Sequence, residues 1–216
     1  MTLPNAHKGV QKLFIAEILQ LIGVALALVG VASYGAILGA YEIGGTQAAY
    51  SMGGAAIGGT ASMVGAVLLP IIALILSLVG LRQASKDEPD YMNKAFWCAI
   101  WALILAVVAG CLQAAGWRGG SSFFSFVGQI LIICMTVFSI MGVSEVTQNI
   151  SRQDVADMGP KVITFTVAAL VIALIASLFG QFVAGIGAII SLALMLLAYV
   201  IYLVFLGKAT SALAKG

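Results

Sequence analysis

Charged side chains are scarce in this sequence, and their scarcity decides the class of protein. Asp, Glu, Lys and Arg make up only 8% of the 216 residues, against about 25% in soluble domains, while 62% are hydrophobic. A soluble protein of this size needs more polar side chains to cover its surface. The composition, with a mean hydropathy of +1.13, therefore predicts an integral membrane protein whose solvent is the lipid bilayer.

Side chains that could carry chemistry are scarce too. The one histidine, His7, lies near the N-terminus, and Cys98, Cys111 and Cys134 lack C-x-x-C spacing. No Walker loop, H-E-x-x-H or G-x-S-x-G motif is present. These absences argue against an enzyme, a metal site and a bound cofactor, and they predict free thiols rather than disulfides. A net charge of only +2 also argues against nucleic acid as a partner.

Long apolar runs, by contrast, recur along the whole chain. A membrane-crossing helix needs about 20 apolar residues, and the runs cover residues 13–33, 62–81, 95–116, 123–143, 162–179 and 184–206. The last two belong to one uncharged stretch that would extend about 67 Å as a single helix, so we expect a turn near Gly180 and Gln181. The sequence thus predicts an all-α, polytopic helical bundle with six transmembrane helices, forming one transmembrane domain over residues 1–216.

The basic residues are distributed unevenly between the two ends of these spans. In the six-span frame, nine of the ten Lys and Arg residues fall on one side and only Arg118 falls on the other. Positive charge is retained on the cytoplasmic side during insertion. We therefore expect a multi-pass protein of the plasma (inner) membrane with both termini in the cytoplasm.

The odd-numbered spans resemble one another. Aligning Lys12, Lys94 and Lys161 places KLFIAEILQLIGVAL, KAFWCAIWALILAVV and KVITFTVAALVIALI in register. This pattern favours three parallel helical hairpins around an axis along the membrane normal. Chance similarity is the alternative, because Leu, Ile and Ala dominate every span.

The two polar connections between predicted spans, near Asp87 and in the segment 143–161, each allow more than one interpretation. Asp87, Glu88 and Asp90 lie in the loop between the second and third spans, and we expect solvated carboxylates there, because a calcium loop needs alternating oxygen ligands and a turn Gly. In the segment 143–161 the apolar spacing predicts that the fourth span continues as an amphipathic helix until Gly159 and Pro160 stop it.

The segment 34–61 is rich in Gly and Ala and carries one charge, Glu42. Its composition fits a loop, an extension of the adjoining helices, or a re-entrant segment. The spacing of Gly35 with Gly39 and of Gly54 with Gly58 favours close helix packing.

Polar side chains within the spans are the candidate ligand-binding residues. Glu17 is the only acidic residue in a predicted span, and Gln20 lies one turn further on the same face. Because Glu17 lies only about 7.5 Å past Lys12 along the helix, an interfacial anchor and a group facing a cavity both remain open. Gln113 and Gln129, with Gln181, lie toward the outer ends of their spans, where their amides either join helices or contact a ligand.

Two functional classes follow from these features. The first is a small-molecule carrier, or the substrate-binding membrane subunit of a transporter whose partner supplies energy. In size, helix count and scarce internal charge the chain resembles the membrane-embedded vitamin-binding subunits of energy-coupling transporters, which is a resemblance of architecture only. The second is a non-catalytic accessory, assembly or regulatory protein that contacts a membrane protein partner or a second copy of itself.

Overall fold

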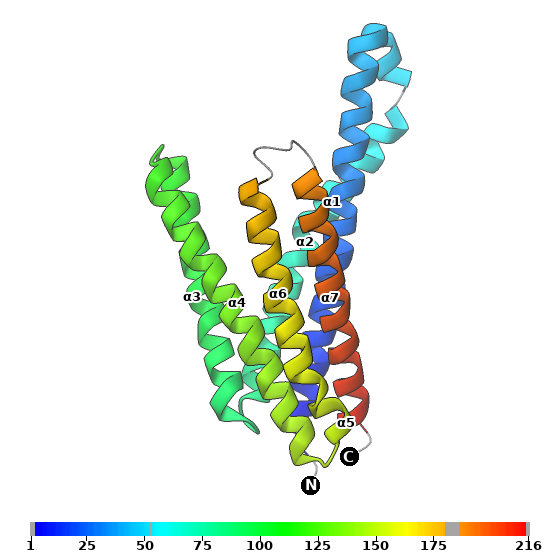
Figure 1. The fold of residues 1–216 in the computed structure, drawn as a ribbon. Helices are drawn as coiled ribbons and strands as arrows, with labels where there is room; N and C mark the ends of the chain where they lie inside the picture. The colour runs from blue at the N-terminus through cyan, green and yellow to red at the C-terminus, as the bar shows by residue number, and fades with distance from the viewer. Residues whose placement is uncertain (1–2, 52, 180–185, 215–216) are drawn as a thin grey trace. The chain divides into compact units, whose positions relative to one another are not determined.

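The protein is helical throughout the part that the structure describes. The computed structural model describes the backbone of residues 3–51, 53–179 and 186–214, without the side chains of residues 38–57 and of most of 170–195. The elements, in chain order, are α1 (Pro4–Ser51), α2 (Gly53–Ala84), α3 (Pro89–Ala114), α4 (Arg118–Asn149), α5 (Gln153–Ala156), α6 (Met158–Phe179) and α7 (Ile186–Leu213). Figure 1 shows these helices and the short connections between them. The prediction of an all-α fold is confirmed for these residues.

Five segments of these helices are long and apolar enough to cross a membrane. They are Pro4–Ile37, Gly58–Ala84, Pro89–Ala114, Arg118–Asn149 and Leu196–Leu213. The fifth predicted span, 162–179, falls on α6, most of whose later side chains lie outside the described part. The expected turn at Gly180 and Gln181 also lies outside the described residues. The structure thus supports the membrane character of the chain, while the number of six spans stays a prediction.

The helices are longer than the apolar runs that predict them. Hydropathy ends a run at the first charges, whereas backbone hydrogen bonds continue a helix into polar surroundings. The difference is largest between residues 34 and 61, where α1 continues to Ser51 and α2 begins at Gly53. Of the three alternatives for this segment, the backbone is that of helix extensions.

The chain divides into two compact units, which are described separately. The main unit comprises Met1–Phe14 and Leu78–Gly216, and the minor unit comprises Ile15–Ser77. Within the main unit α3 packs along α4, α6 packs along α7, and α4 also contacts α5, α6 and α7. The prediction of one transmembrane domain over residues 1–216 stays a prediction.

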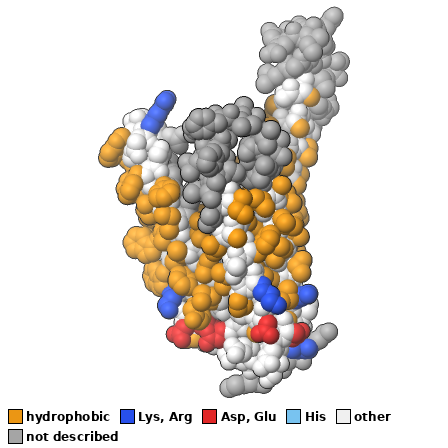
Figure 2. All heavy atoms as spheres, in the orientation of Figure 1, with side chains coloured by type: hydrophobic (Ala, Val, Ile, Leu, Met, Phe, Trp, Pro, Cys, Tyr) orange, Lys and Arg blue, Asp and Glu red, His pale blue; other side chains and the backbone are white. Residues whose placement is uncertain are grey.

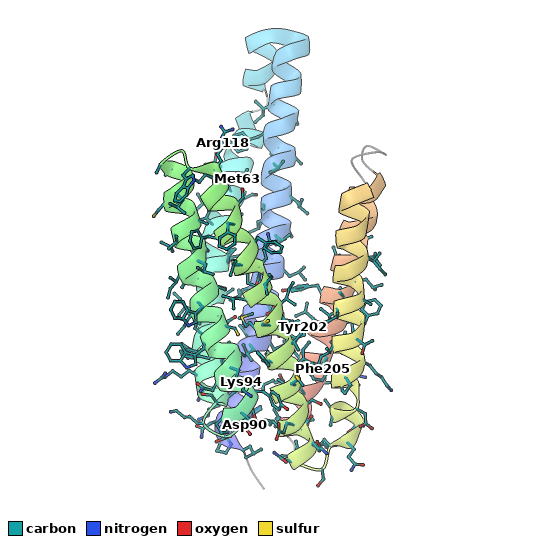
Figure 3. The ribbon with its side chains drawn as sticks, turned by 60° about the vertical axis from the view of Figure 1, so that its left-hand side comes forward. Met63, Asp90, Lys94, Arg118, Tyr202 and Phe205 are labelled. Carbon is teal, nitrogen blue, oxygen red and sulfur yellow. The ribbon has the colours of Figure 1, made fainter. Side chains whose placement is uncertain are left out.

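The core of the main unit lies toward one end of its helices, called here the charged end. Large side chains that are fully buried there include Met92, Ile140, Leu206 and Phe205. Figure 2 shows that acidic and basic side chains gather at this end, while apolar side chains cover the helices beyond it. In Figure 3, Asp90 and Lys94 lie at the charged end of the α3–α4 hairpin and Arg118 lies at the other end.

The minor unit is held together by close contacts between α1 and α2. A Cβ atom added to Gly23 would lie 3.0 Å from Cδ of Pro70, and one added to Gly30 would lie 3.0 Å from Cγ of Met63. Gly35 and Gly58, by contrast, have open space where a Cβ would lie. The expectation of close packing is therefore wrong for these two glycines; Gly39 and Gly54 have no described side-chain surroundings.

The connection between α2 and α3 is a capping structure rather than a solvated loop. Asp87 accepts hydrogen bonds from the backbone N–H groups of Asn5 and Ala6 at 2.9 and 2.8 Å. Glu88 is only 4% exposed and accepts from the backbone N–H groups of Asp90, Tyr91 and Met92. The solvated interpretation is wrong for Glu88, because a carboxylate that satisfies unpaired N–H groups at a helix start can be buried.

The connection between α4 and α6 also differs from its prediction. Helix α4 ends at Asn149, and Ser151 follows with a φ of 60°. Gly159 and Pro160 lie in the first turn of α6 instead of stopping an earlier helix. Proline is well tolerated in a first turn, because its missing N–H would have no helical partner there.

Candidate functional site

The strongest candidate for a binding site is a groove along the outer half of the α3–α4 hairpin. Small residues on one face of α3, namely Ala102, Ala106, Ala109 and Gly110, meet Ser125, Gly128, Gln129 and Ile132 on one face of α4. These positions repeat every three or four residues, which is the spacing of one helix face. Because the side chains are small, the two helices approach closely and leave a shallow groove, called here the amide groove.

Two predicted site residues lie in the amide groove. Gln113 from the last turn of α3 and Gln129 from the first half of α4 both line it. The groove has a volume of about 310 Å³, which is at the lower end of the range for small-molecule sites. The sequence places both amides toward the outer ends of their spans, and the structure places both on the same groove. Gly128, next to Gln129, lies level with Ala102 and Leu105, so Gln129 lies toward one end of the groove and Gln113 toward the other.

The position of the groove follows from the turn between the two helices. The N–H of Trp117 donates to the carbonyl of Leu112, and Gly116 adopts a φ of 81°. This left-handed glycine after a helix end is the usual Schellman arrangement, and it reverses the chain within a few residues. The reversal sets α4 antiparallel to α3, so that the two helices pack side by side and form the two walls of the groove.

The polar side chains of the amide groove can form hydrogen bonds with a neutral ligand. Each glutamine amide can donate two hydrogen bonds and accept others without changing its charge, and the Ser125 hydroxyl adds a further donor and acceptor. None of the residues that line the groove is ionisable at neutral pH. Among the described residues no cluster of His, Cys, Asp or Glu could hold a metal ion.

The other two predicted site residues belong to the minor unit. Glu17 is half-buried and Gln20 is exposed, and both lie on α1. The structure keeps them on one helix face, one turn apart, as predicted. The role of Gln181 as a candidate lies outside the described residues.

The sequence predicted none of the other residues that line the groove as site residues. Ser125 and Phe124 are the two of them with hydroxyl or aromatic side chains. Ser125 could have been found from its spacing, because it lies four residues before Gln129 and so shares its helix face. Nothing in the sequence marks Phe124, because aromatic residues are common near membrane interfaces.

The cysteines do not contribute to this groove. Cys98, Cys111 and Cys134 are all free thiols, as predicted.

Comparison of the chain with protein-family models, with curated proteins and with solved structures finds no match.

Proposed function

We propose that the protein is a multi-pass carrier of the plasma (inner) membrane, or the substrate-binding membrane subunit of a transporter, that binds a small neutral molecule in the amide groove. The observation that carries this proposal is that two amides, those of Gln113 and Gln129, line one groove among apolar helices. No ATP-binding motif is present in the sequence, so transport against a gradient would need a partner that supplies energy.

Lipid hydrocarbon cannot form hydrogen bonds with a glutamine side chain. Gln113 and Gln129 are exposed on the hairpin. Gln113 lies one residue from the end of α3, whereas Gln129 lies within α4, where hydrocarbon offers no hydrogen-bond partner to its amide. A polar group left unpaired in such surroundings costs about 1–3 kcal/mol. A ligand with matching donors and acceptors would remove this cost, and its apolar part would contact the alanines of α3.

The alternative is a non-catalytic accessory or assembly protein, and one observation favours it. The groove is lined mainly by Ala and Gly, the residues that allow another transmembrane helix to approach closely, with polar side chains forming hydrogen bonds across the contact. In that case a membrane protein partner, or a second copy of this chain, would satisfy the two amides.

Native mass spectrometry of the protein extracted from its own membrane separates the two functions. We expect a bound small molecule on the unaltered protein, and we expect its loss from a Gln113→Leu/Gln129→Leu variant, because leucine keeps the volume and removes the amides. Gln148→Leu is the matched control, because Gln148 is an exposed glutamine of α4 outside the groove.

Other results would change the conclusion. If the double variant loses a bound protein or its own second copy instead of a small molecule, the assembly function replaces the carrier function. If the double variant and the Gln148→Leu control retain the same bound masses, the amide groove is not the site.

A further inference from the structure

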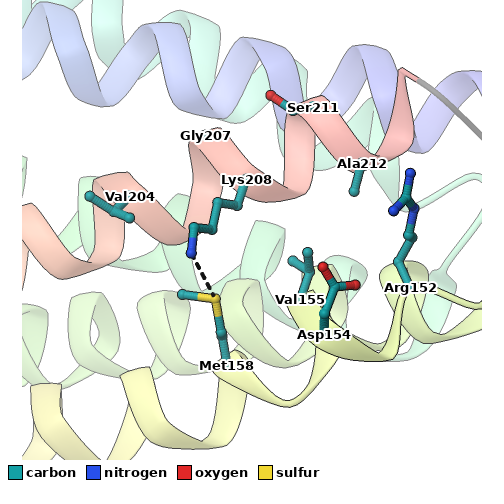
Figure 4. A pocket seen from close by; sticks show the side chains of 9 residues that line it. All are labelled: Arg152, Asp154, Val155, Met158, Val204, Gly207, Lys208, Ser211 and Ala212. Atoms are coloured by element: carbon teal, nitrogen blue, oxygen red, sulfur yellow. Dashed lines mark hydrogen bonds between the residues drawn. The ribbon is translucent and has the colours of Figure 1, made fainter.

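A second pocket lies at the charged end of the main unit, between the last turns of α7 and the segment formed by α5 and the start of α6. Figure 4 shows it from close by. Its volume is about 550 Å³, and its charged lining residues are Arg152, Asp154 and Lys208. The rest of its lining is mainly apolar and includes Val155, Met158 and Val204.

The charges of this pocket are arranged as two cations with one carboxylate. In Figure 4 the Lys208 ammonium is directed toward Met158, while the Asp154 carboxylate and the Arg152 guanidinium lie further toward the end of α7. Nζ of Lys208 donates only a weak hydrogen bond, 3.8 Å long, to Sδ of Met158. Among the described residues neither cation has a carboxylate within ion-pair distance. Both cations are exposed and can therefore bind a ligand.

An apolar stripe on α7 leads from the middle of the helix to this pocket. Leu196, Val200 and Val204 follow one another at four-residue spacing and are 56%, 42% and 49% exposed. Lys208 is the next residue in the same series, which winds slowly round the helix and so leads from Val204 to the lysine. A water-soluble ligand would gain no binding energy from contact with these apolar side chains, whereas the acyl chains of a lipid would pack along them.

We propose that this pocket binds the headgroup of a phospholipid that carries both a phosphate and a primary ammonium group, as in phosphatidylethanolamine. Arg152 and Lys208 bind the phosphate oxygens through charge-assisted hydrogen bonds. Asp154 accepts hydrogen bonds from the lipid ammonium, and the acyl chains contact Val204, Val200 and Leu196. A purely anionic headgroup would meet the repulsion of Asp154, and a choline headgroup has no N–H to donate to it.

This inference is independent of the amide groove, because it concerns other residues and another ligand. It rests on the membrane character of the helices and on the composition of the pocket. Basic pockets between transmembrane helices near the membrane surface commonly hold lipid headgroups. The additional carboxylate is the feature that distinguishes one headgroup from another here.

The experiment is native mass spectrometry of the full chain in nanodiscs that contain equal amounts of phosphatidylethanolamine, phosphatidylglycerol and phosphatidylcholine. We expect phosphatidylethanolamine to be retained preferentially. Arg152→Gln/Lys208→Gln should reduce the retention of phosphatidylethanolamine about tenfold, since each cation near the membrane surface is worth several-fold in binding. The matched control is Lys8→Gln/Lys86→Gln, which removes two exposed lysines outside the pocket and should retain phosphatidylethanolamine as the unaltered protein does.

Asp154→Asn provides a second test that does not depend on lost binding. Removing the carboxylate should reverse the preference from phosphatidylethanolamine to phosphatidylglycerol, which is a gain that an unfolded protein cannot show. Soluble glycerophosphoethanolamine should compete only weakly, because it lacks acyl chains. Equal retention of the three lipids, equal losses in both double variants, or full competition by the soluble compound would each overturn the proposal.

Discussion

Single glycines set how closely the helices of the main unit approach. A Cβ atom added to Gly9 of α1 would lie 2.6 Å from the carbonyl oxygen of Gly80 and 2.7 Å from the backbone nitrogen of Ala84. Both of these atoms belong to the backbone of α2, so no side-chain rotation can relieve the clash. The close contact between the start of α1 and the end of α2 therefore requires a glycine at position 9, because glycine has no Cβ atom.

Gly9→Ala should accordingly destabilise the protein. We expect a loss of about 1–3 kcal/mol in the free energy of unfolding, the usual range for overpacking a close contact. The measurement is thermal unfolding in a mild detergent, followed by circular dichroism.

Gly35→Ala is the control on the same helix. Its added methyl group meets nothing within 4 Å, and alanine favours helix by up to about 1 kcal/mol over glycine. The control should therefore unfold at the same temperature as the unaltered protein or a higher one. Equal destabilisation by both variants would show that Gly9 is not a site of close helix approach.

At the scale of elements, one short connection caps two helices. The four residues between α2 and α3 include Asp87, which accepts hydrogen bonds from the start of α1, and Glu88, which caps α3. These adjacent carboxylates complement the positive N-terminal ends of two helices. The connection therefore ties α1 and α3 to the end of α2.

Glu88→Ala should destabilise the protein by about 1–2 kcal/mol, because it removes the acceptor for the first N–H groups of α3. Asp90→Ala is the control, since Asp90 lies in the same first turn but is exposed. Urea unfolding in detergent compares the two variants. A loss as large for Asp90→Ala would mean that general charge at the helix start matters, rather than the cap of Glu88.

At the end of α4, by contrast, a substitution should stabilise the protein. Ser151 holds a left-handed backbone with a φ of 60°, and its N–H donates to the carbonyl of Gln148. Glycine adopts this conformation at no steric cost. Ser151→Gly should therefore stabilise the protein by about 0.5–1 kcal/mol, measured as a rise in Tm.

The same substitution elsewhere on α4 should have the opposite effect. Ser122 lies within the helix, where glycine is unfavourable by about 0.5–1 kcal/mol relative to a better helix former. Ser122→Gly should therefore lower Tm or leave it unchanged. A fall in Tm for Ser151→Gly would contradict the interpretation of Ser151 as the left-handed residue of a helix end.

At the scale of the whole molecule, the distribution of basic residues leads to a prediction of orientation. Arg118 lies at one end of the α3–α4 hairpin, and Lys94 lies at the other, within the charged end. If positive charge marks the cytoplasmic side, the turn near Arg118 faces outward and α5 faces the cytoplasm.

Labelling with a membrane-impermeant maleimide would test this orientation in intact cells. In a background without the three natural cysteines, Ser122→Cys should react from outside. Gln153→Cys, an exposed position of α5, should react only after the cells are opened. The reverse pattern would place both termini outside.

The sequence predicted the helical class and the approximate centres of the spans, because long apolar runs report directly on lipid as solvent. It could not predict the cap at Asp87, because its hydrogen-bond partners Asn5 and Ala6 lie about 80 residues away in the sequence. The cap at Glu88 was missed although its partners, Asp90, Tyr91 and Met92, are local. For the candidate site, the positions of Gln113 and Gln129 along their helices could be predicted from the sequence. Whether both side chains face the same groove depends on the rotation of each helix about its axis. The nearly uniform apolar composition of the two helices does not specify this rotation.

The length of α1 has a consequence for how the protein meets its surroundings. Its 48 residues correspond to a rise of about 72 Å, against a hydrocarbon layer of about 30 Å. Fitting the whole helix within that layer would require a tilt of about 65°, well beyond the roughly 40° limit seen for transmembrane helices. Part of α1 must therefore stand outside the bilayer, although the segment 34–51 carries only one charge, Glu42.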